Sequence, residues 1–178
     1  MASPSINERD AAPPPVWHLA QVNIAQMRAP MTDPIMAEFV AGLGPVNALA
    51  DSSPGFVWRL VEDEHGHATD DRPFGDDRIL INLSVWESRE ALQHFVYHTL
   101  HQQFLKKRRE WFERMKEAWV VLWWVPAGHR PTVVEAKARL EHLRTHGESP
   151  HAFSFREPFP PPAEASPEAA SAAHQSSI

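Results

Sequence analysis

Three histidines with helical spacing are the first residues of this sequence whose types and positions could do chemistry. His94, His98 and His101 stand at i, i+4 and i+7, so a helix presents all three on one face. Apolar residues turn towards this face after His101, so we expect His101, with His98 beside it, to be partly buried. A partly buried imidazole titrates near neutral pH, which makes His101 or His98 a candidate general base. The alternative is an ordinary solvated helix face.

The sequence gives weaker support for a metal site than for a general base. The chain has no Cys, which excludes thiolate ligands, and the helical histidines lack the adjacent Glu of an H-E-x-x-H zinc site. His65 and His67 flank Gly66 in a polar loop, where a solvated surface is a better interpretation than an ion site. We therefore predict that no metal is bound.

Alternating residues on the predicted strands form a second pattern, an aromatic pocket that holds a few amides. In residues 17–24 and 78–86, the smoother apolar face is assigned to the helices, which places Gln21, Asn23 and Asn82 together on the opposite face. The walls would come from tryptophans of three strands: Trp58, Trp86 and Trp123. A mostly apolar pocket with a few placed polar groups is typical of a small-molecule site. The alternative is a hydrated interface that binds only water.

Two arginines could bind an anionic group of such a ligand. Arg59 follows Trp58 on a predicted strand, and Arg108 lies on the His101 side of the long helix. The basic run 106–109 around Arg108 fits a solvated face, because the formal net charge of −6 argues against a nucleic-acid surface. The chain also lacks G-x-S-x-G, G-x-G-x-x-G after a strand and a P-loop. The sequence therefore has none of the motifs expected of a serine hydrolase, a dinucleotide-binding protein or an NTPase.

The elements that must position these residues occur in the order β-α-β-β-α-β, followed by one more helix. Pro-rich stretches at 1–15 and 158–178 are predicted to be disordered tails, which leaves 16–157 as the domain. The predicted strands cover 17–24, 56–62, 78–86 and 118–125, and the predicted helices cover about 33–50, 88–117 and 132–147. The apolar side of the middle helix shifts near His98 and His101, so this helix either kinks there or is covered on two sides.

This order is typical of a ferredoxin-like α+β fold, in which helices pack on one face of an antiparallel four-stranded sheet. The fourth strand is apolar on both faces, so a partner subunit or a ligand should cover the second face. Six of the seven tryptophans fall on predicted strands. A homodimer joined through its sheets would hide them and enclose the pocket, and Trp123→Glu would then disrupt the dimer.

The chain shows no apolar run long enough to span a membrane. Residues 1–15 also lack the basic and apolar regions of a secretory signal. We therefore expect a cytoplasmic protein that contacts neither membrane nor nucleic acid.

Three long segments resemble the bacterial family called domain of unknown function 3291. They are HLAQVNIAQMRAPMTDPIMAEFVAGLGPVNALADSSPGFVWRL, LSVWESREALQHFVYHTLHQQFLKKRREWFERM and EHLRTHGESPHAFSFREPF. That family is grouped with the dimeric α/β-barrel superfamily, alongside small antibiotic-biosynthesis monooxygenases. The resemblance implies a dimeric α/β barrel and, at the level of fold analogy, a cofactor-free oxygenase of a small aromatic or polyketide-like substrate.

In an enzyme of this kind, His101 or His98 would be the base, and Asn23 and Asn82 would stabilise the oxyanion. One alternative is a non-catalytic dimer that binds a hydrophobic ligand. The other is a haem protein, because some members of the superfamily hold haem through a helix histidine about five turns after a strand-end tryptophan. From Trp86 that distance leads to Leu105, with His101 a turn earlier. Haem is therefore a minority expectation, and no cofactor is the main one.

Overall fold

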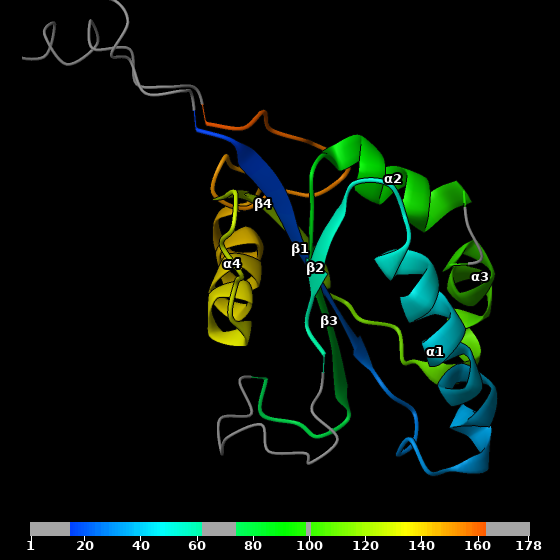
Figure 1. The fold of residues 1–178 in the computed structure, drawn as a ribbon. Coiled ribbons are helices and arrows are strands. Elements are labelled where there is room, and N and C mark those ends of the chain that lie inside the picture. Colours follow the sequence, from blue (N-terminus) through cyan, green and yellow to red (C-terminus); the bar gives the residue numbers. More distant parts are fainter. Residues whose placement is uncertain (1–14, 62–73, 99–100, 163–178) are drawn as a thin grey trace, which may run out of the picture.

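Four antiparallel strands form one sheet at the centre of the chain (Figure 1). The computed structural model describes residues 15–61, 74–98 and 101–162, without the side chains of 98 and 101–105. The strands are β1 (Trp17–Gln26), β2 (Phe56–Arg59), β3 (Ile79–Trp86) and β4 (Val120–Pro126), in the order β2-β3-β1-β4. The helices are the short η2 (Pro34–Met36), then α1 (Ala37–Asp51), α2 (Arg89–His98), α3 (His101–Trp111) and α4 (Val133–His146). The predicted ferredoxin-like α+β fold with an extra C-terminal helix is confirmed.

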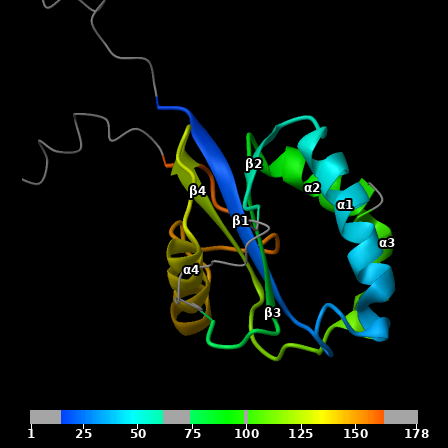
Figure 2. The ribbon, with the colours of Figure 1, turned by 60° about the horizontal axis from the view of Figure 1, so that its bottom comes forward.

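Helix α4 covers the sheet face that we assigned to the helices, and α1, α2 and α3 cover the opposite face, which we expected a partner or a ligand to cover. The Thr132 hydroxyl accepts a hydrogen bond from Glu135 N at 3.1 Å, and Gly147 ends the helix with a φ of 79°. Between these caps, a buried stripe at i, i+4 and i+7 packs on the sheet: Ala136, Leu140 and Leu143. Figure 2 shows α4 on one side of the sheet and α1, α2 and α3 on the other. The expectation of helices on one face is therefore wrong, and the homodimer stays a prediction.

The helix expected over 88–117 is two helices, α2 and α3, which run in different directions (Figure 1). The change lies between His98 and His101, where the apolar pattern allowed a kink. Helix α3 ends at Trp111 because the chain then bonds to the end of β1. Trp111 O accepts a hydrogen bond from Arg28 N at 2.9 Å, and Glu113 N donates one to Gln26 O at 2.8 Å. These long-range backbone bonds end the helix earlier than its local sequence predicts.

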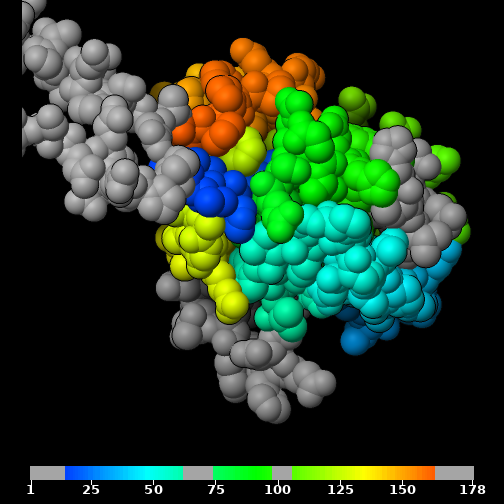
Figure 3. Space-filling view, turned by 45° about the horizontal axis from the view of Figure 1, so that its top comes forward, coloured from blue at the N-terminus to red at the C-terminus, as the bar shows by residue number. Residues whose placement is uncertain are grey.

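The segment after α4 packs on the α2 side of the sheet (Figure 3). Phe153 forms an antiparallel bridge with Leu122 of β4, and the carbonyl of Phe159 accepts a hydrogen bond from Trp124 Nε1 at 2.9 Å. The packed chain therefore continues beyond the boundary that we expected at residue 157. The loop with His65 and His67, residues 1–14 and residues 163–178 lie outside the described part of the chain. No helix in the described part is long and apolar enough to cross a membrane.

Gly55, in the turn from α1 to β2, is required by both conformation and space. Its φ is 77°, and a Cβ there would lie 2.6 Å from Ala91 Cβ of α2. We expect Gly55→Ala to lower the free energy of unfolding by about 2 kcal/mol, through the left-handed backbone and the close contact together. Urea unfolding measures this loss. In the control Gly128→Ala, φ is 88° and the new Cβ meets nothing within 4 Å, so we expect about 1 kcal/mol. Equal losses would contradict the contact with Ala91.

Candidate small-molecule site

A cavity of about 430 Å³ lies between the sheet and helices α1, α2 and α3. Its lining is mainly apolar and includes aromatic side chains from every side: Phe39, Phe56, Trp86, Phe95 and Trp111. We predicted an aromatic pocket with amides, and this cavity has that composition. Its location differs from the prediction, because it lies under the helices of one chain and the opposite sheet face packs on α4. The alternating pattern grouped the side chains by face correctly, but α1, α2 and α3 lie on the side opposite to the one that we assigned to the helices.

Polar side chains of β1 and β3 form one wall of the cavity. Asn23 pairs with Asn82 and Gln21 pairs with Ser84 across the two strands, and all four line the cavity. Directly opposed residues of antiparallel strands point to the same side of a sheet, which explains this block. Among the described residues, none hydrogen-bonds to the side-chain amide of Asn23 or Asn82. Both amides are therefore available to a ligand.

Gln21 and Ser84 lie deeper and are hydrogen-bonded to each other. Only 6 % of Gln21 and 5 % of Ser84 is exposed. Gln21 Nε2 lies 2.9 Å from Ser84 Oγ and 3.3 Å from the backbone oxygen of Asn82. Trp86 Nε1 lies 3.0 Å from the same Ser84 Oγ. This network fixes the indole of Trp86, which lines the cavity.

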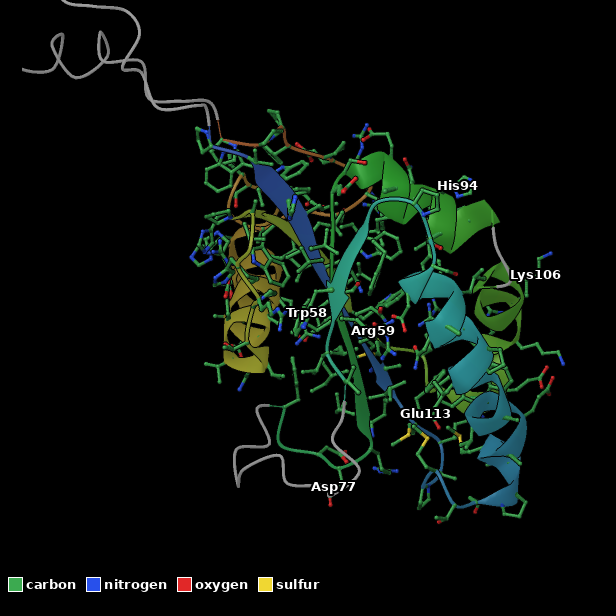
Figure 4. The ribbon with its side chains drawn as sticks, viewed as in Figure 1. Trp58, Arg59, Asp77, His94, Lys106 and Glu113 are labelled. Atoms are coloured by element: carbon green, nitrogen blue, oxygen red, sulfur yellow. The ribbon has the colours of Figure 1, made fainter. Side chains whose placement is uncertain are left out.

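A β-bulge decides which side chains of β2 reach the cavity. The register between β2 and β3 shifts between Phe56 and Trp58, and such a bulge reverses the alternation locally. Phe56 and Arg59 line the cavity, whereas Trp58 packs into the core on the α4 side. Figure 4 shows Trp58 and Arg59 on opposite sides of the strand. The prediction that Trp58 is a cavity wall is therefore wrong.

Arg59 already has an anionic partner within the chain. Its Nε and Nη2 atoms lie 2.7 and 3.1 Å from the two carboxylate oxygens of Asp51, at the end of α1. This paired geometry satisfies one edge of the guanidinium. Arg59 therefore links α1 to β2 at the cavity lining, and any ligand must compete with Asp51 for its charge.

Trp123 lies on the far face of the sheet from the cavity. It is fully buried, packs with α4 and donates a hydrogen bond from Nε1 to Glu135 Oε1 at 3.0 Å. The pattern of β4 had suggested a cavity wall, because the strand is apolar on both faces. The residue is instead part of the core beneath α4, so this prediction is also wrong.

Arg108 is the cation in the cavity that lacks a carboxylate partner among the described residues. It projects from α3, and its guanidinium carbon stands 4.0 Å from the ring centre of Trp119, another lining residue. Partial burial, and then the charge of the neighbouring Arg109, lower the pKa of Arg108 below its usual value. The arginine stays cationic at neutral pH, because the usual pKa of a guanidinium lies far above neutral. Its guanidinium is available to bind an anionic group of a ligand.

The predicted bases are not placed by the described atoms. His98 ends α2 and His101 begins α3, but both side chains lie outside the described part of the structure. His94 is exposed and lies with Gly55 and Ala91 at a separate shallow hollow (Figure 4). Among the side chains that the structure describes, no three His, Asp or Glu groups gather as metal ligands would. His98 and His101 stay predictions.

Asn47 is a cavity residue that the sequence reasoning missed. It lines the cavity from α1, and no described residue hydrogen-bonds to its side chain. The signal was present, because Asn47 is the only polar side chain between Glu38 and Asp51 of that helix. A lone amide on an otherwise apolar helix face is a marker of a ligand contact.

Comparisons with known proteins give one family and several distant structures, among them the following three. No curated protein matches the chain. A conserved protein from Methanosarcina mazei is 13% identical over 62% of this chain and 92% of its own, with a TM-score of 0.43. SnoaB, a cofactor-independent oxygenase from Streptomyces nogalater, is 16% identical over 65% and 96%, with a TM-score of 0.38. NE2512, of unknown function, from Nitrosomonas europaea is 10% identical over 66% and 95%, with a TM-score of 0.41.

Likenesses at these TM-scores carry no functional information. The family model is different, because it matches residues 18–169 and so spans every element of the sheet and all the helices. The chain belongs to the domain of unknown function family DUF3291.

Proposed function

We propose that this chain is an enzyme that binds a small aromatic or polyketide-like molecule as an anion and oxygenates it without a cofactor. The observation that carries the proposal is Arg108, a half-buried guanidinium with no carboxylate partner among the described residues, in a cavity of aromatic walls and unpaired amides. The aromatic walls of such a cavity can pack against the rings of a ligand, and its hydrogen-bond donors can bind a negatively charged oxygen. The activity is the one that the family resemblance implied.

The reaction requires from the protein only a base and a set of hydrogen-bond donors. A base removes a proton from an acidic ring CH₂ that is conjugated through the aromatic rings with a ring carbonyl, and the resulting anion spreads its charge onto the carbonyl oxygen. Arg108, Asn23 and Asn82 stabilise that oxygen, which lowers the free energy of the anion. The carbanion carbon then bonds to O₂, and the peroxide takes up a proton and loses water. The CH₂ becomes C=O, one oxygen atom stays in the product, and the other leaves as water. His101 or His98 is the proposed base.

Oxygen uptake with anthrone tests this proposal. We expect one O₂ consumed per anthraquinone formed, in chelator-treated buffer, at a rate well above spontaneous oxidation. His101→Ala or His98→Ala should remove the enzymatic rate and leave the thermal midpoint nearly unchanged. Heat-denatured protein is the control for the spontaneous reaction. A rate equal to that control would overturn the enzymatic proposal.

A non-catalytic binding protein is the second candidate. One observation favours it: the side chains that the structure describes around the cavity include no His, Asp or Glu to act as a base. This candidate predicts that anthrone quenches the tryptophan fluorescence in a saturable way without any O₂ uptake. Absence of both quenching and uptake would contradict both functions.

A further inference from the structure

The hydroxyl of Ser84 is buried at the cavity wall and contacts two side chains. Its oxygen lies 2.9 Å from Gln21 Nε2 and 3.0 Å from Trp86 Nε1. An indole N–H can only donate, so Ser84 Oγ accepts the bond from Trp86. Its role towards Gln21 depends on which way the amide of Gln21 is turned.

The backbone oxygen of Asn82 settles the orientation of that amide. It lies 3.3 Å from the Gln21 atom that also contacts Ser84. A backbone oxygen only accepts, so a reversed amide would place two carbonyl oxygens against each other. The atom is therefore nitrogen, and it donates to both Asn82 O and Ser84 Oγ. Ser84 accepts two hydrogen bonds, and its own proton is left to donate.

No described residue accepts that proton. Only 5 % of Ser84 is exposed, and the residue lines the cavity. The O–H of Ser84 can therefore point only into the cavity. A buried donor without an acceptor is energetically unfavourable. The pocket therefore has a hydrogen-bond donor of fixed position and polarity, and a ligand oxygen there would recover this cost.

We propose that Ser84 is a specificity-determining residue that selects ligands with a carbonyl or phenolate oxygen at this wall of the cavity. The inference rests on the proposed function and assigns to Ser84 the recognition of the ketone or enolate oxygen of its substrate. Gln21 and Trp86 are positioning residues, because they occupy the lone pairs of Ser84 and so force its proton outward. An aromatic hydrocarbon of equal size lacks the acceptor and binds less tightly.

Two matched probes test the inference: anthraquinone carboxylate and the anthracene carboxylate substituted at the same ring position. Both carry the carboxylate for Arg108, and only the quinone carries carbonyl oxygens. Quenching of tryptophan fluorescence gives Kd for each. We expect the wild-type chain to bind the quinone about 5- to 10-fold more tightly, the range of one net hydrogen bond. This comparison needs no variant.

Variants then assign the preference to the hydroxyl. Ser84→Ala should abolish the preference and change Kd for the anthracene probe less than about twofold. Ser84→Thr keeps the hydroxyl and should keep the preference, which also controls for a loss of folding through the unpaired Gln21 and Trp86. Equal binding of the two probes by the wild-type chain, or a preference that survives Ser84→Ala, overturns the role of Ser84 and leaves the proposed function standing. Failure of both probes to bind overturns the proposed function and this inference together.

Discussion

Trp123→Ala is expected to lower the free energy of unfolding by about 3–5 kcal/mol, the usual cost of removing a large aromatic side chain from a core. The exposed fraction of Trp123 is 0%, and the ring packs between the sheet and α4. The change opens a cavity and also leaves Glu135 Oε1 without the hydrogen bond that it accepts at 3.0 Å. Equilibrium unfolding in urea, followed by circular dichroism, measures the loss.

Val134→Ala is the matched control on the same helix. Val134 is 62% exposed, so its truncation should change the free energy of unfolding by less than about 0.5 kcal/mol. A loss below about 1 kcal/mol for Trp123→Ala would contradict the packing of α4 on the sheet. Trp123→Ala also tests the mode of dimerisation, because a Trp123 that is fully covered by α4 cannot contact a second subunit. Separation of a folded dimer into folded monomers by this substitution would contradict the placement of α4.

Arg108→Met is expected to weaken the binding of anthraquinone carboxylate by about 30- to 100-fold. A hydrogen bond to a charged group contributes about 1.5–3 kcal/mol, and Arg108 is half-buried where water competes less well for the anion. Methionine preserves much of the apolar contact with Trp119. Fluorescence quenching at a fixed ionic strength measures Kd for the variant and the wild-type chain.

Two controls isolate the charge at this position. Arg109→Met removes a neighbouring positive charge that is exposed and does not line the cavity, so we expect Kd to change less than about twofold. The uncharged parent anthraquinone should lose less affinity than the carboxylate in the Arg108→Met variant, because a neutral carbonyl accepts a weaker hydrogen bond than a carboxylate. An unchanged Kd for the carboxylate in Arg108→Met would show that another group receives the anion, with Arg59 the next candidate.

The sequence determined the order of the elements and the grouping of side chains by sheet face. Residues two apart on a strand point to the same side, so alternation alone grouped Gln21 with Asn23 and Asn82 with Trp86. Caps are equally local, because Thr132 and Gly147 satisfy backbone groups within a few residues of themselves. Both kinds of signal act over short stretches of chain and can be read without the tertiary structure.

Tertiary contacts decided what local patterns leave open. Alternation of residue types along a strand does not say which helices cover which face of the sheet. That choice is made when Ala136, Leu140 and Leu143 of α4 pack on one face. The end of α3 depends on bonds from Gln26 and Arg28 to residues far along the chain. The bulge in β2 depends on its pairing with β3, and it sends Trp58 away from the cavity.

The candidate site shows the same division between local and long-range causes. Arg108 and Asn82 could be picked out by residue type and position in a predicted element. The role of Ser84 could not, because the direction of its proton depends on two donors from different positions, one of them on another strand. Hydrogen-bond polarity at a buried site is a property of the assembled neighbours, and only the folded chain brings Gln21 and Trp86 to the same oxygen.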